Sequence, residues 1–160
     1  MNDQVYIHYG ATKFDPTKNF PISNEPHWVK PRGGTWASRV NAGFGWKDWN
    51  ESEEFIECNP DNSFQFTIKE GANIAFIKTT ADLQKLPVQN ESKWNADHPW
   101  SRYLIDFEKC LELGIDGIEL CIYGDEYEGA DYFPIHYALY GWDCDSIVIL
   151  NPDVVVPLEV

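Results

Sequence analysis

Three short stretches of this sequence carry side chains that could bind a ligand and assist a reaction on it. They are residues 8–10, 33–46 and 143–145. Together they supply a histidine, aromatic rings, hydroxyl-bearing residues and two carboxylates. A flat cationic ring is well held between aromatic faces, and a carboxylate stabilises positive charge that develops as a bond breaks. These residue types are therefore candidates for a binding or catalytic site.

The first stretch follows a run of β-branched and aromatic residues, 4–9, that closes on Gly10 and predicts a short strand. His8 and Tyr9 lie at the end of this strand. A histidine at such a position either contacts a ligand or is an ordinary strand residue whose hydrogen bonds are satisfied within the protein.

The second stretch begins with two glycines that let another group approach the backbone closely, and it continues into a predicted strand at 35–38. A turn at 43–46 follows. The two tryptophans of this stretch either stack on a ligand ring or fill the core. The candidate binding residues here are Gly34, Thr35, Trp36, Ser38 and Trp46.

The third stretch opens a predicted strand at 143–150. Asp143 and Asp145 are two residues apart, which would put both carboxylates on one face of that strand. Like charges on one face repel, so the pair needs solvent, a basic partner or a catalytic task. Glu119, on another predicted strand, is a further candidate acid; the alternative for the aspartate pair is a solvated strand edge protected by charge.

Helices are expected between these strands. Asp48 is a plausible N-cap for a helix over 49–58, and the periodicity after Ser101 predicts another that ends at Gly114. Alternation predicts a β-hairpin with Glu70 and Gly71 as its turn. The class is therefore α+β. The remaining predicted elements are strands at 63–69, 73–78, 115–122 and 154–158, a short helix at 80–86, and exposed loops at 11–30 and 88–100.

Composition supports a single domain over residues 1–160. Hydrophobic residues make up 43% and aromatic residues 15%, so the chain can bury a sizeable core. The net charge of -14 disfavours membrane surfaces and non-specific nucleic-acid binding. The cysteines and histidines lack metal-ligand spacing, and no secretory leader or long apolar run occurs, so we expect no metal and a cytoplasmic setting.

The order of these features resembles the ADP-ribosyltransferase superfamily, and particularly its branch with a histidine, an aromatic residue and an acid, similar to the poly-ADP-ribose polymerases and diphtheria-type toxins. The resemblance implies two small packed mixed or antiparallel sheets with flanking helices, and NAD as the substrate. His8 then contacts a ribose hydroxyl, and Gly10 holds the nicotinamide amide, with Tyr9 inserted between them. Trp46 stands where the family has a stacking tyrosine, and Asp145 where it has glutamate, so the resemblance makes Asp145 the preferred catalytic acid and Glu119 the fallback. Asp143 takes the position that aids target recognition.

The implied activity is NAD-dependent ADP-ribosyl transfer to an unknown macromolecular acceptor. A chain of this size would suit a bacterial or phage effector, or the toxin of a toxin–antitoxin pair with an antitoxin or inhibitor protein as partner. If water is the acceptor, the protein is an NAD glycohydrolase. A non-catalytic module that keeps the fold and binds NAD, another nucleotide or a protein is the other alternative.

Overall fold

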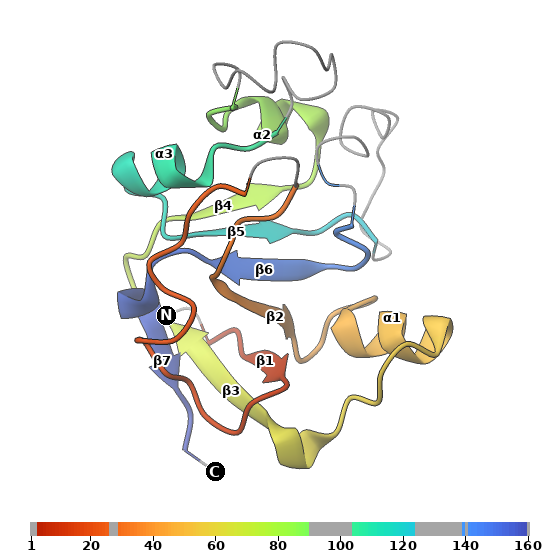
Figure 1. The fold of residues 1–160 in the computed structure, drawn as a ribbon. Coiled ribbons are helices and arrows are strands. Elements are labelled where there is room, and N and C mark those ends of the chain that lie inside the picture. The colour runs from red at the N-terminus through yellow and green to blue at the C-terminus, as the bar shows by residue number, and fades with distance from the viewer. Residues whose placement is uncertain (1–2, 26–28, 90–103, 124–138, 140, 160) are drawn as a thin grey trace.

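The computed structural model describes residues 3–25, 29–89, 104–123, 139 and 141–159, and shows an α+β protein (Figure 1). The strands are β1 Tyr6–Tyr9, β2 Thr35–Arg39, β3 Ser63–Ile68, β4 Ile74–Ile77, β5 Gly117–Leu120, β6 Ser146–Ile149 and β7 Val155–Pro157. The helices are α1 Trp46–Glu53, α2 Thr80–Gln84 and α3 Phe107–Glu112. Short 3₁₀ turns, Pro60–Asn62 and Pro152–Val154, precede β3 and β7.

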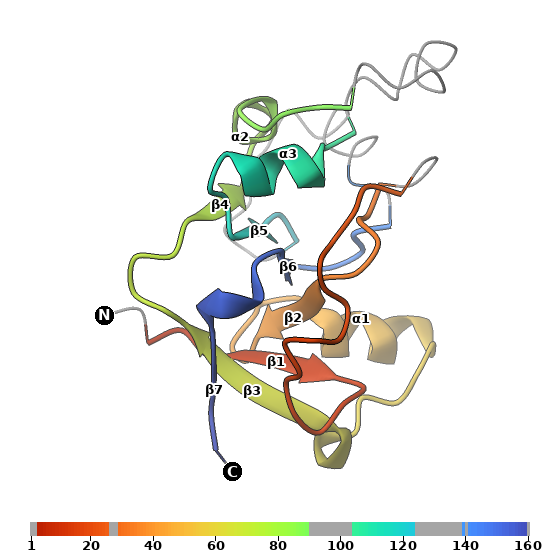
Figure 2. The same cartoon turned by 60° about the vertical axis from the view of Figure 1, so that its left-hand side comes forward.

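The strands form one seven-stranded sheet in the order β4-β5-β6-β2-β1-β3-β7. Neighbouring strands are antiparallel except for the parallel pair β4 and β5. The sheet is curled, so that β3 and β7 run at a steep angle to β4, β5 and β6 (Figures 1 and 2). The expected two small sheets are thus joined into one, because β2 forms hydrogen bonds with both β6 and β1.

Strand β2 lies between β6 and β1 and pairs with each of them over a different part of its length. The candidate site lies where the pairing with β1 is missing. Residues 35–37 pair with β6, whereas only Ser38 and Arg39 pair with β1. Beyond Ile7 the register of β1 with β2 ends, and the side chain of His8 bonds to the carbonyl of Trp36 instead. The two strands therefore diverge at the residues that the sequence analysis singled out.

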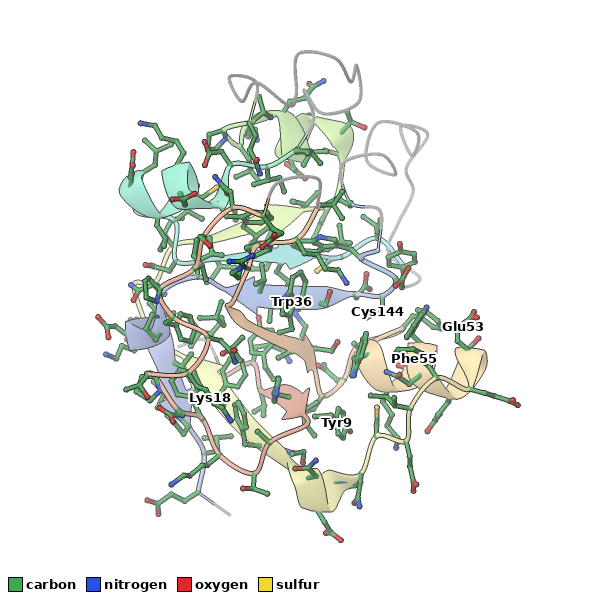
Figure 3. All side chains as sticks on the ribbon, viewed as in Figure 1. Tyr9, Lys18, Trp36, Glu53, Phe55 and Cys144 are labelled. Atoms are coloured by element: carbon green, nitrogen blue, oxygen red, sulfur yellow. The ribbon has the colours of Figure 1, made fainter. Side chains whose placement is uncertain are left out.

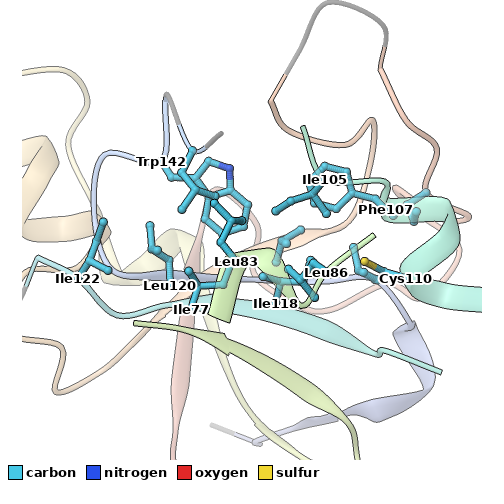
Figure 4. Close-up of a cluster of buried hydrophobic side chains, with 14 residues drawn as sticks. Ile77, Leu83, Leu86, Ile105, Phe107, Cys110, Ile118, Leu120, Ile122 and Trp142 are labelled. Carbon is cyan, nitrogen blue, oxygen red and sulfur yellow. The ribbon is translucent and has the colours of Figure 1, made fainter. Parts of the chain in front are cut away.

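Helices α2 and α3 cover one face of β4, β5 and β6 and enclose a hydrophobic core (Figure 4). Leu83 of α2 and Phe107 and Cys110 of α3 pack there against strand residues and Trp142. A second cluster on β1, β3 and β7 centres on Tyr6 and Phe66, whose rings stack at 5.5 Å. Among the described residues, no helix has the length and apolar character needed to cross a membrane.

Helix α1 begins earlier than the sequence predicts. Its N-cap is Gly45, and the carboxylate of Asp48 accepts a hydrogen bond from the Gly45 amide at 2.8 Å, so Asp48 lies inside the first turn. The Ser38 hydroxyl accepts from the Trp46 amide at 2.9 Å and satisfies a second free donor of this helix end. The helix ends at Glu53 because Glu54 adopts a left-handed backbone with φ 51°.

The predicted hairpin of β3 and β4 is wrong, although both strands exist. β3 lies between β1 and β7, while β4 pairs with β5 in parallel. Alternation of apolar residues identifies a strand but not its partner. Helix α3 begins at Phe107 with Asp106 as its N-cap, Gly114 has φ 81° as expected at a helix end, and residues 101–103 of that prediction lie outside the described residues.

Candidate functional site

A cavity of about 290 Å³ opens where β1 and β2 diverge, and we call it the aromatic cavity. Its walls come from β1, β2, the start of α1 and the segment before β6. Two of its residues, Tyr9 and Trp36, are labelled in Figure 3. Its lining includes His8, Tyr9, Lys30, Trp36, Trp46, Trp142 and Asp143. Four of the predicted binding residues, and one of the two aspartates, thus line one cavity.

His8 is held firmly in this wall. Its Nδ1 lies 2.6 Å from the Trp36 carbonyl oxygen, and its ring stacks on Phe64 at 4.9 Å. Because a carbonyl oxygen only accepts, Nδ1 carries a proton, which leaves Nε2 for another group. A Cβ on Gly10 would lie 3.8 Å from Nε2, so His8 and Gly10 are close neighbours; Gly10 has φ 114°, which favours glycine.

The tryptophan rings are already partly covered. Lys30 Nζ lies 5.4 Å from the centre of the Trp36 ring, and Trp142 meets Trp36 edge to face at 4.7 Å. Trp46 stacks on Trp49 at 5.3 Å with an interplanar angle of 19°. A ligand ring that stacks on Trp46 must therefore use the face that Trp49 leaves uncovered, and one that stacks on Trp36 competes with Lys30.

Lys30 is a site residue that the sequence analysis missed. Burial lowers the pKa of its ammonium group, and the negative charge of Asp143 opposes that effect. No local pattern marks Lys30, because it reaches the cavity only when the loop between β1 and β2 folds back over Trp36. It is the sole cation among the described residues that line this cavity.

Trp142 contributes a buried donor to the cavity wall. The side chain is 1% exposed, and its indole N–H has no hydrogen-bond partner in the described part of the chain. A buried donor without a partner is costly, and because this N–H is itself buried it is not open to the cavity. Cys144 lines the same wall, but burial raises the pKa of its thiol to about 12, which keeps it protonated at neutral pH.

The two aspartates are separated rather than paired. β6 begins at Ser146, so neither acid lies on a strand and the predicted shared face is wrong. Asp145 accepts hydrogen bonds from the amides of Ile122 and Tyr123, at 2.7 and 2.8 Å, and so fixes the end of β5. Asp145 does not line the aromatic cavity, whereas Asp143 does.

Glu119 is engaged elsewhere. It is 2% exposed, and its carboxylate accepts from Arg39 Nε and Nη2 at 2.8 and 2.9 Å and from the Tyr6 hydroxyl at 3.0 Å. Burial first, and then the charge of Glu119, raise the pKa of Tyr6. The geometry gives Glu119 the role of a buried ion-pair partner that joins β5 to β1 and β2.

The other predicted residues support the walls. Ser38 Oγ donates to the Asp145 carbonyl at 2.8 Å and accepts from the Trp46 amide, so it joins β2, α1 and the acid-bearing segment, and its single proton is already donated. Gly34 has φ 82°, and a Cβ there would lie 2.9 Å from Val148 Cγ2. Glycine is needed at this position for β2 to pack on β6.

A second cavity of about 350 Å³, which we call the loop cavity, is lined mainly by the end of β1 and the loop that follows it. His8 lines both cavities. The walls of the loop cavity include Gly10, Lys13, Lys18 and Thr35, and Lys18 is labelled in Figure 3. Asp15 lines the same cavity, so its charged walls hold two lysines and one carboxylate, and these side chains leave a net charge of one positive unit. No described carboxylate lies within 4.0 Å of either lysine ammonium group.

Comparisons with models of known protein families, with curated proteins and with solved structures find no match. Within the described residues, no group of histidine, cysteine or carboxylate side chains is arranged to hold a metal ion. What the geometry defines is therefore an α+β protein with an aromatic cavity and a loop cavity that meet at one histidine.

Proposed function

We propose that the protein is an NAD-dependent ADP-ribosyltransferase with an ADP-ribosyltransferase-like fold, and that the aromatic cavity is its active site. The observation that carries the proposal is the meeting of His8, Trp36, Trp46 and Asp143 in one cavity, although they come from four segments of the chain. The role as an effector, or as the toxin of a toxin–antitoxin pair, belongs to the same proposal.

The two cavities suit the two halves of a dinucleotide. The nicotinamide ring would stack on Trp46 in the aromatic cavity. His8 Nε2 would contact a ribose hydroxyl, since it lies at the boundary of the two cavities. The diphosphate and adenosine would enter the loop cavity beside Lys13 and Lys18.

The chemistry needs one carboxylate near the ribose. The bond between the ribose C1 carbon and the nicotinamide nitrogen breaks, nicotinamide leaves with the bonding electrons, and positive charge develops on the ribose. Asp143 is the described cavity acid that would stabilise this charge. An acceptor nucleophile then attacks the opposite face of C1, giving inversion, and loses its proton; water as the acceptor gives NAD glycohydrolase activity.

A second function, NAD binding without turnover, is favoured by a specific observation. Asp145 and Glu119 are both committed to hydrogen bonds within the protein, so only Asp143 of the three candidate acids lines the cavity. A module of this kind would keep the ligand contacts of His8 and Trp46 without a catalytic glutamate.

The test is to incubate the purified protein with NAD, alone and with cell extract, while nicotinamide release and the NAD-induced shift in Tm are followed. Asp143→Asn is the test variant, and Asp153→Asn, an exposed acid in the turn before β7, is the matched control. Release that falls in the first variant only supports the enzyme. A shift in Tm without release supports the binding module, and neither effect overturns both functions.

A further inference from the structure

Helix α1 and the segment that follows it present an apolar strip at the mouth of the aromatic cavity. Trp46 stacks on Trp49, and Trp49 meets Phe55 edge to face at 5.5 Å. Phe55 is 64% exposed and Ile56 51% exposed, and Ile56 also lines the cavity. Phe55 and Glu53 are both labelled near α1 in Figure 3. Large apolar side chains that stay in contact with water beside a cavity are typical of an interaction surface.

This strip is surrounded by negative charge. Residues 46–58 carry one basic side chain, Lys47, against Asp48, Glu51, Glu53, Glu54 and Glu57. Lys47 lies 3.9 Å from Glu51, and within the described chain no basic group lies within 4.0 Å of the carboxylates of Glu53, Glu54 or Glu57. We call the strip and these acids the α1 face.

The negative charge of these acids affects ionisable groups at the rim of the aromatic cavity. Burial raises the pKa of Tyr9, and the nearby negative charges of Glu51 and Asp48 add to that effect. Burial and the charge of Glu51 also raise the pKa of the Cys58 thiol. An anion at this rim is therefore disfavoured and a cation favoured.

We propose that the α1 face docks a basic segment of a partner protein, in which arginine or lysine side chains alternate with apolar ones. The apolar side chains would cover Phe55 and Ile56, and the basic ones would pair with the free glutamates or lie over the ring of Phe55. A second copy of this chain, a nucleic acid or an anionic membrane fits poorly, because the net charge of -14 repels each of them.

This inference goes beyond the proposed function and needs no NAD. A partner docked on the α1 face would lie at the mouth of the aromatic cavity, where a nucleophilic side chain of that partner could reach the NAD site. A macromolecular acceptor is therefore expected to carry such a basic and apolar segment. The docking surface and the NAD site are made of different side chains apart from the cavity rim, and each can fail without the other.

The experiment measures the binding of a fluorescent peptide of alternating arginine and leucine to the full chain, without NAD, by fluorescence anisotropy. The same peptide with glutamate in place of arginine is the charge-reversed probe. The test variants are E53Q/E54Q/E57Q and Phe55→Ala. The matched controls are E70Q/E112Q/E159Q, which removes the same charge from distant exposed positions, and Leu113→Ala, since Leu113 is 58% exposed.

We expect the triple α1 variant to weaken binding by about tenfold and to reduce its salt dependence, because each exposed charge pair contributes modestly. Phe55→Ala should weaken binding by about tenfold with the salt dependence unchanged. Both control variants should bind within about twofold of the wild type. Equal weakening in the two triple variants, unchanged binding by Phe55→Ala, or equal binding of the charge-reversed peptide would overturn the proposal.

Discussion

Breaking the ion pair of Arg39 and Glu119 from each side in turn tests the structural role given to Glu119. Glu119 is 2% exposed, whereas the Arg39 side chain is 35% exposed. Arg39→Met leaves a buried carboxylate without its cation, which costs about 3–5 kcal/mol. Glu119→Gln leaves a guanidinium that water can still reach, so the loss is the smaller cost of unmade hydrogen bonds, about 1–3 kcal/mol.

The assay is urea unfolding followed by tryptophan fluorescence at neutral pH, with the slope of each transition compared to ensure that the same surface is exposed. We expect Arg39→Met to lower the free energy of unfolding more than Glu119→Gln. The double variant should be more stable than Arg39→Met alone, because it has no uncompensated buried charge. An equal or reversed order, or a loss in both single variants within the ordinary range of surface substitutions, would refute the reasoning.

Two further predictions concern the walls of the site. Gly34→Ala should lower stability by about 1–3 kcal/mol more than Gly71→Ala in urea unfolding, since both have positive φ but only the Cβ at Gly34 meets Val148, at 2.9 Å; equal losses would contradict the packing argument. Lys30→Met should raise stability at neutral pH, because burial lowers the folded-state pKa of Lys30 below its ordinary 10.5 and the unfolded chain then binds more protons. As pH rises toward 10.5, Lys30 loses its proton and the stability penalty for burying its charge disappears. The Tm values of the wild type and the variant should therefore converge at high pH. A constant difference in Tm would show that the charge of Lys30 is not the cause.

Local patterns in the sequence predicted the strands well. The run 4–9 and the segment 115–122 contain β1 and β5, and the stretch at 35–38 covers β2 except for Arg39, because β-branched, aromatic and other apolar residues are typical of strands. The partners of those strands were not predictable in the same way. The turn at Gly71 exists, yet β4 pairs with β5 through contacts that no local pattern contains.

The candidate site was predicted where it depends on position along a strand and was missed where it depends on the loops. His8, Trp36 and Trp46 meet in the cavity because they flank the point where β1 and β2 diverge. Asp145 turns away because two backbone amides at the end of β5 hold its carboxylate. Backbone amides are present at every position and leave no mark in a sequence, so this contact could not be foreseen.

Nicotinamide release from NAD by the wild type and by Asp143→Asn, measured together with the NAD-induced shift in Tm, tests the central proposal most directly. The account predicts release by the wild type, a loss of about 10²-fold or more in the variant, and a retained shift in Tm, because the carboxylate acts on the developing charge more than on binding. Release that is unchanged in Asp143→Asn would contradict the assignment of the acid. The absence of both release and a shift in the wild type would contradict the NAD site itself.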